Sequence, residues 1–194
     1  MKKIEQVYRE ILFQAIENKK RVLTQLELSK KLGFSLSTIN LAVKKLEKMN
    51  SIIIGKMNFR AIDAKKILYL WASTRNIEKD IIYKTRAEMP VTDIEKSMPE
   101  IVYGAYSAYK FKFEEVPADY SEVYVYASHE ELEILKKRFP ENGKVPNLFV
   151  LKSSGIEKYS KTGTIAQIFV DLWNLQQWYA SDFLKALEER LKQG

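Results

Sequence analysis

Apolar residues recur at helical spacing through residues 24–49, and polar residues fill the positions between them. In the second half of this segment the apolar positions follow steps of three and four, the spacing of one buried helix face. They are Leu36, Ile39, Val43 and Leu46, and the first half holds Leu26, Leu28 and Leu32. Thr24 and Ser35 are suitable N-caps, and Gly33 lies between the halves. The pattern predicts two short helices joined by a tight turn.

The other side of the second predicted helix is polar at its start and basic towards its end. Its candidate contact residues are Ser35, Ser37, Thr38, Asn40, Lys44 and Lys45. A helix that enters the DNA major groove needs short donors and acceptors near base edges, with cations near phosphates. The segment therefore favours a DNA-binding helix-turn-helix. The alternative is an ordinary amphipathic helix pair with a solvated polar face.

Two short runs of β-branched and aromatic residues follow, within residues 51–62, and a Gly-Lys-Met-Asn turn separates them. This pattern predicts a β-hairpin, and a hairpin directly after a recognition helix is the wing of a winged helix. Lys56 and Arg60 are expected on or next to its tip, in contact with backbone phosphate or the adjacent minor groove. The alternative is a stabilising hairpin whose cations face solvent.

The rest of the chain predicts a mixed architecture. Amphipathic patterns indicate helices within residues 1–21, 63–74, 92–98, 104–109, 129–139, 164–175 and 178–192, and strands at 122–127 and 147–151. We predict an α+β protein with a winged helix-turn-helix over residues 1–75 and a small α/β domain over residues 76–194. The polar segment 75–80 is the predicted boundary.

Charge is distributed unevenly between these two parts. Residues 1–75 hold 16 Lys and Arg against 6 Asp and Glu, a net charge of +10. Residues 76–194 hold 16 against 19, a net of −3, which together give the chain's +7. A basic part joined to a mildly acidic one indicates a polyanion-binding module attached to a second domain.

Composition excludes several kinds of site. The chain has no cysteine and one histidine, His129, so disulfides, thiolate metal sites and multi-histidine clusters are excluded. We interpret His129 as a helix cap and Asp171 as a buried hydrogen-bonding anchor. No Walker or GxGxxG motif occurs, and we predict no catalytic residue, cofactor or metal. No apolar run is long enough for a membrane span, and charges interrupt any signal-peptide core, which points to the cytoplasm.

Two segments of the second part resemble a known family. Residues 102–109, VYGAYSAY, resemble the G-x-x-A helix start of nucleotidyltransferase-like domains, and residues 162–172, TGTIAQIFVDL, resemble the Q-ϕ-ϕ-x-D-L segment of AbiEi-type antitoxins. In that family a winged helix precedes a nucleotidyltransferase-like domain, and the protein represses its own type IV toxin–antitoxin operon. The resemblance implies an operator DNA as partner, with a cognate toxin system.

The same resemblance implies a site that has lost its chemistry. An active nucleotidyltransferase has Gly-Ser or Gly-Gly at a helix start, followed by a strand whose Asp-x-Asp pair holds Mg²⁺. Here Ala105 follows Gly104, and Val123 and Val125 align best with the two carboxylates. Valine cannot bind a hard cation. We therefore expect a nucleotidyltransferase-like domain that is not an enzyme.

The sequence thus favours a DNA-binding transcriptional regulator, an autorepressing antitoxin-like protein, and two alternatives stay open. One is an atypical nucleotidyltransferase that uses Glu122 with Glu114 or Asp119. The other is a regulator whose second domain binds a small molecule and shifts DNA affinity. For the first hypothesis, Asn40 is expected to pair with adenine, while Lys44 contacts phosphate. The sequence leaves the oligomeric state open.

Overall fold

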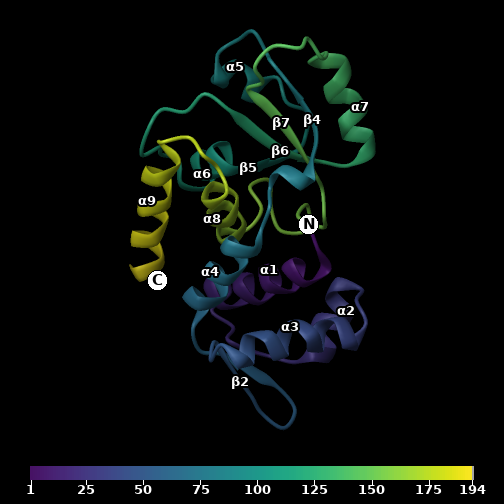
Figure 1. Ribbon diagram of the computed structural model, residues 1–194, viewed down its shortest axis with the longest axis vertical. Helices are drawn as coiled ribbons and strands as arrows, with labels where there is room; N and C mark the ends of the chain where they lie inside the picture. Colours follow the sequence, from purple (N-terminus) through teal and green to yellow (C-terminus); the bar gives the residue numbers. More distant parts are fainter. Residues whose placement is uncertain (194) are drawn as a thin grey trace. The chain divides into compact units, whose positions relative to one another are not determined.

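The computed structural model describes residues 1–193, which form two compact units, Met1–Arg75 and Asn76–Gln193. Each unit has its own helices and its own β-sheet (Figure 1). No helix among the described residues is long and apolar enough to cross a lipid bilayer.

The N-terminal unit consists of four helices and a small sheet. Its elements in chain order are α1 (Lys3–Ile16), β1 (Val22–Leu23), α2 (Gln25–Leu32), α3 (Leu36–Lys48), β2 (Ile52–Ile54), β3 (Phe59–Ala61) and α4 (Ala64–Thr74). The strands are antiparallel in the order β1-β3-β2. The predicted helices and hairpin of this unit are present. Strand β1 was not predicted, because two residues carry no detectable period.

Local capping explains where these helices begin. The hydroxyl of Thr24 accepts a hydrogen bond from the Glu27 backbone N–H at 3.1 Å, and the carboxyl of Asp63 accepts one from the Lys66 N–H at 2.9 Å. Each bond satisfies an N–H that has no partner inside the helix. The core beneath is apolar and includes the fully buried Ile11, Leu12 and Trp71.

The C-terminal unit is built on a four-stranded sheet in the order β4-β7-β6-β5. Its elements are a 3₁₀ turn (Glu78–Asp80), β4 (Ile81–Thr85), α5 (Val91–Lys96), β5 (Val102–Gly104), α6 (Ala105–Phe113), β6 (Val123–Ala127), α7 (His129–Arg138), β7 (Leu148–Lys152), α8 (Ile165–Trp173) and α9 (Ala180–Gln193). Strand β6 is parallel to β7, and the other two pairs are antiparallel. Strands β4 and β5, which form the two edges of the sheet, were not predicted.

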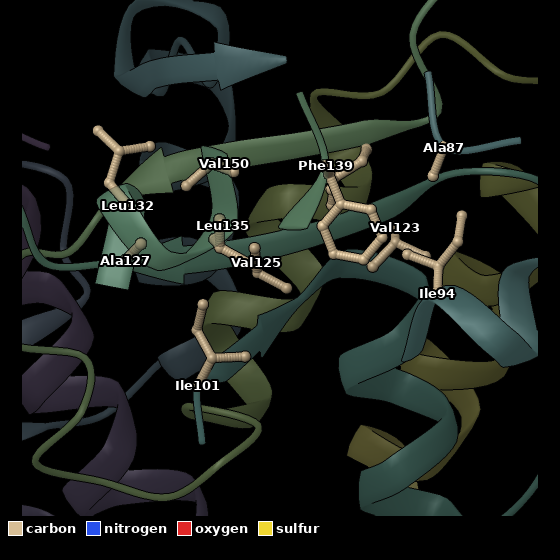
Figure 2. Packing of buried hydrophobic residues seen from close by; sticks show 11 residues of the cluster. Ala87, Ile94, Ile101, Val123, Val125, Ala127, Leu132, Leu135, Phe139 and Val150 are labelled. Atoms are coloured by element: carbon tan, nitrogen blue, oxygen red, sulfur yellow. The ribbon is translucent and has the colours of Figure 1, made fainter. Parts of the chain in front are cut away.

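Side chains of β6 alternate between the two faces of the sheet, as the pleat requires. Val123, Val125 and Ala127 pack with residues of α5 and α7, including Ile94 and Leu135, in one hydrophobic cluster (Figure 2). The intervening Tyr124 and Tyr126 face α6 and α8 on the other side. The domain therefore has two cores, one on each face of the sheet.

The start of α7 corrects one expectation. Ser128 is the N-cap, and its hydroxyl accepts from the Glu131 N–H at 3.3 Å while the Glu131 carboxylate accepts from the Ser128 N–H at 2.6 Å. This reciprocal pair is a capping box. His129 is the first residue of the helix and not its cap, because the serine before it already supplies the capping oxygen.

Candidate nucleic-acid interface

The turn between α2 and α3 is fixed by glycine and by a side-chain bond. Gly33 has φ 68°, in the left-handed region that glycine adopts without strain, and its N–H donates to the Ser29 carbonyl at 2.9 Å. The Ser29 hydroxyl donates to the Phe34 carbonyl at 2.6 Å. Helix α3 then begins at its N-cap Ser35, whose hydroxyl accepts from the Thr38 N–H at 3.3 Å. The predicted caps and turn are confirmed.

One side of α3 is completely buried and holds the helix in the unit. Ile39, Ala42, Val43 and Leu46 each have 0% exposure. Leu36, which was predicted on this side, is 50% exposed, so that prediction was wrong. Leu36 is the first residue of the helix, where few neighbours are available to cover a side chain. Ala42 takes part in the buried face instead, and its small side chain allows close packing.

The outward side of α3 carries most of the predicted contact residues. Ser37, Lys44 and Lys45 are exposed, and Thr38 is half-buried. Ser35 is exposed too, but its hydroxyl lies 2.9 Å from that of Ser37 and 3.0 Å from that of Thr38, so the three form a small hydroxyl cluster at the helix start. These hydroxyl groups are short donors and acceptors at the N-terminal end of α3. In helix-turn-helix proteins, this end of the second helix contacts the base edges.

Leu41 also lies on this outward side, and it was not among the predicted contact residues. Its side chain is 65% exposed. The signal was available, because Leu41 is four residues after Ser37 and three before Lys44, which places all three on one helix face. Leucine is more often a core residue, and its residue type alone therefore does not indicate exposure here.

Asn40 is placed less freely than expected. It is half-buried, and its side-chain Nδ2 donates a hydrogen bond to Oε1 of Gln25 at the start of α2, at 3.2 Å. The amide therefore links the two helices. To form a bidentate pair with adenine, Asn40 would have to exchange this bond.

The wing consists of β2, β3 and the loop of residues 55–58 between them (Figure 1). The Gly55 N–H donates to the Asn58 carbonyl at 2.8 Å and closes the loop. Lys56 is exposed in this loop, as predicted. Arg60 is also exposed, but it lies in β3, paired across the sheet with Val22 and Ile53. It therefore belongs to the outer face of the sheet and not to the tip.

The cations of this surface are electrostatically available. Among the described residues, none of Lys44, Lys45, Lys56 and Arg60 forms an ion pair. Other lysines of the same unit are engaged, since Lys31 pairs with the buried Glu10 at 2.7 Å and Lys20 pairs with Glu27. Unpaired cations can neutralise phosphates without first breaking an internal bond.

In the C-terminal unit, the two positions that were aligned with metal-binding carboxylates hold apolar side chains. Val123 and Val125 have 0% exposure and belong to the hydrophobic cluster. Glu122 accepts hydrogen bonds from the hydroxyls of Ser121, at 3.0 Å, and Tyr179. No group of three or more acidic or histidine side chains among the described residues could hold a metal ion.

The two segments that suggested a family meet inside this unit. The buried hydroxyl of Tyr126 donates to the Asp171 carboxyl, with distances of 2.7 and 2.6 Å to its two oxygens. Gln167 Nε2 donates to the same carboxyl at 2.8 Å. A Cβ atom on Gly104 would lie 3.1 Å from the Tyr126 ring and 3.4 Å from Asp171 Oδ2. Gly104 thus allows β5 to approach this buried network, in which Asp171 is the hydrogen-bonding anchor predicted.

Comparison with known proteins identifies the N-terminal part. Residues 9–53 match the model of a family described as winged helix-turn-helix DNA-binding. The match includes α2 and α3 and ends within β2. The chain therefore has an N-terminal winged helix-turn-helix DNA-binding domain. No curated protein and no solved structure matches the chain.

Proposed function

We propose that the protein is a sequence-specific, DNA-binding transcriptional regulator. The observation that carries the proposal is the two-sided character of α3. Hydroxyl and ammonium groups are exposed on its outward side, and the apolar residues of its opposite side are fully buried. A helix held so rigidly can present the same groups to every base pair it meets, which sequence discrimination requires. The unpaired cations Lys44, Lys45 and Lys56 supply the phosphate contacts that fix its register.

The test is a gel shift with the DNA upstream of the protein's own gene and a random duplex of equal length. At about 0.15 M salt, the physiological ionic strength, we expect the upstream DNA to bind at least about 10³-fold more tightly, the low end for specific binding. Equal affinity for both duplexes would contradict the proposal. For any variant of α3 or the wing that loses a positive charge, Lys137→Ala is the matched control, since Lys137 is an exposed lysine of α7.

We further propose that the C-terminal unit is a nucleotidyltransferase-like domain without catalytic activity, and that the protein acts as an autorepressing antitoxin. Support comes from the order β5, Gly104, α6 and β6, which matches a glycine helix start followed by the strand that carries carboxylates in active enzymes. Ala105 has φ 46°, a conformation that favours glycine, at the place of the second small residue of the motif. In this proposal Val123 and Val125, both buried, take the places of the two carboxylates of an active enzyme.

Two experiments examine this second proposal. Incubation with labelled nucleoside triphosphates, Mg²⁺ or Mn²⁺, and RNA or protein acceptors should give no incorporation. Incorporation that Glu122→Gln abolishes would favour the atypical enzyme instead. The antitoxin role is tested with the neighbouring gene. If the product of that gene is toxic, co-expression of this protein should relieve the toxicity. Failure to relieve it would contradict the antitoxin role but not the proposed DNA binding.

A further inference from the structure

Leu41 occupies the middle of the outward side of α3, and its 65% exposure is the highest of any leucine among the described residues. Single exposed apolar residues are common on protein surfaces and need no explanation by themselves. The position of Leu41 is the informative fact. It lies one turn after the hydroxyl of Ser37 and one turn before the ammonium groups of Lys44 and Lys45.

The polar groups beside Leu41 are engaged within the protein, or are exposed lysines suited to contact with phosphate. Asn40 donates its amide hydrogen to Gln25, and the Ser35 hydroxyl caps the helix. Lysines that contact phosphates position a protein on the duplex but carry no sequence information. Among the side chains in the middle of this face, that of Leu41 is therefore the one best placed to distinguish base pairs.

The edges of base pairs in the major groove are hydrogen-bond donors and acceptors, with one apolar exception. That exception is the C5-methyl group of thymine, and apolar side chains are its usual partners. Against a guanine edge, a leucine would exclude water from the N7 and O6 acceptors and return no hydrogen bond. Against thymine, it buries apolar surface on both sides.

We propose that Leu41 is a specificity-determining residue that selects a pyrimidine C5-methyl group in the major groove beneath the middle of α3. The inference rests on the proposed DNA binding and adds the chemistry of one base contact. Its ligand class is thymine, and 5-methylcytosine presents the same methyl group at the same place. The sequence preference of the protein should therefore include one thymine that no hydrogen bond explains.

The test removes the methyl group and the side chain separately. The preferred duplex is first selected from a random pool with the full-length protein. Each thymine in it is then replaced in turn by deoxyuridine, which lacks only the methyl group. For the wild-type protein, one replacement should weaken binding about fourfold, the ratio expected for one buried methyl group.

Leu41→Ala should bind the thymine and deoxyuridine duplexes equally, because the partner of the methyl group is gone. Alanine is a better helix former than leucine, so the exposed substitution should leave the fold intact. Ile134→Ala is the matched control, since Ile134 is 45% exposed on α7 of the other unit. This control should keep the fourfold sensitivity. Replacing cytosine by 5-methylcytosine should restore affinity in a duplex where that cytosine has taken the thymine's place.

The alternative results distinguish failure of the proposed DNA binding from failure of the inference about Leu41. If the pool yields no preferred duplex, the proposed function and this inference fall together. If a preferred duplex exists but no deoxyuridine replacement weakens binding, or if Leu41→Ala keeps the wild-type sensitivity, only this inference falls. If Leu41→Ala instead changes sedimentation of the free protein and not its DNA affinity, Leu41 belongs to a contact between copies.

Discussion

The amide of Asn40 in α3 donates a hydrogen bond to the amide oxygen of Gln25 in α2, across 3.2 Å. The bond joins the helix expected to contact bases to the helix that precedes it. Asn40 is half-buried, so its amide is held by the domain before any DNA arrives. A side chain that is fixed in advance loses less freedom on binding, but it must also exchange its existing partner. Substitution of Asn40 can therefore act on binding, on the helix pair, or on both.

Asn40→Ala and Gln25→Ala separate these two roles. If Asn40 contacts adenine, Asn40→Ala should weaken binding to the preferred duplex by on the order of 1–3 kcal/mol and leave random DNA nearly unaffected. Gln25→Ala removes the helix-linking bond but keeps the Asn40 amide, so it should cost far less affinity. Gel shifts on both duplexes measure these effects, with urea unfolding to follow stability. If the two variants lose equal unfolding free energy and neither loses affinity, Asn40 only links the helices.

Lys44→Ala should weaken preferred and random duplexes alike. Lys44 is exposed and forms no ion pair among the described residues, so its charge is free to replace a counterion at a phosphate. Loss of one such contact should reduce the slope of log affinity against log salt concentration by about one unit. The measurement is a salt titration of binding, with Lys137→Ala as the control that should leave the slope unchanged. A variant that loses sequence preference at constant slope would assign Lys44 to a base edge instead.

The sequence was sufficient for the parts of the fold that depend on local signals. Caps such as Thr24 and Ser35 act within three residues, and the glycine turn at Gly33 is equally local, so the helix-turn-helix followed directly from the pattern. The edge strands β4 and β5 could not be predicted from such local signals. They are defined by pairing with β7 and β6, which are distant in the chain, and a period cannot show such pairing.

The candidate site shows the same limit at the level of single residues. Ser37 and Lys44 lie on the exposed face because the helical period places them there. The hydrogen bond between Asn40 and Gln25 joins residues that are fifteen positions apart in the chain. It depends on the tertiary packing of two helices, and the helical period does not predict it. Leu41 could have been found from the period alone. Its residue type favours the core, whereas its position in the period favours the exposed face, and the position is what the structure follows.

Tyr126→Phe should destabilise the C-terminal unit by about 1–3 kcal/mol, the cost of removing a hydrogen bond to a buried polar group. The Tyr126 hydroxyl donates to the fully buried Asp171 carboxyl, and phenylalanine cannot replace that donor. Urea unfolding measures the effect. Tyr8→Phe is the matched control: the Tyr8 hydroxyl is buried but has no hydrogen-bond partner among the described residues, so its removal should cost nothing or stabilise the protein. Equal losses for both variants would mean that the bond to Asp171 contributes no more than a buried hydroxyl without a partner.

Alkaline pH should destabilise the protein through its buried tyrosines. Burial, assisted by the negative charge of Glu5, raises the pKa of Tyr8 from 10 to about 12. Burial also raises the pKa values of Tyr106 and Tyr124. A raised pKa in the folded state means that the folded protein holds protons which the unfolded chain releases near pH 10. The stabilisation is therefore complete below about pH 10 and is lost as the pH rises towards the folded pKa.

Near-ultraviolet absorbance of tyrosinate and urea unfolding, both followed between pH 8 and pH 12, would test this expectation over the range in which tyrosines titrate, about pH 10. Only part of the absorbance of the 11 tyrosines should appear while the protein is folded, and the rest should appear together with unfolding. In Tyr8→Phe the unfolding free energy should fall less steeply with pH, because one proton is no longer released on unfolding. If every tyrosine titrates near pH 10 in a protein that is still folded, burial does not protect these hydroxyls and the tyrosine clusters are open to water.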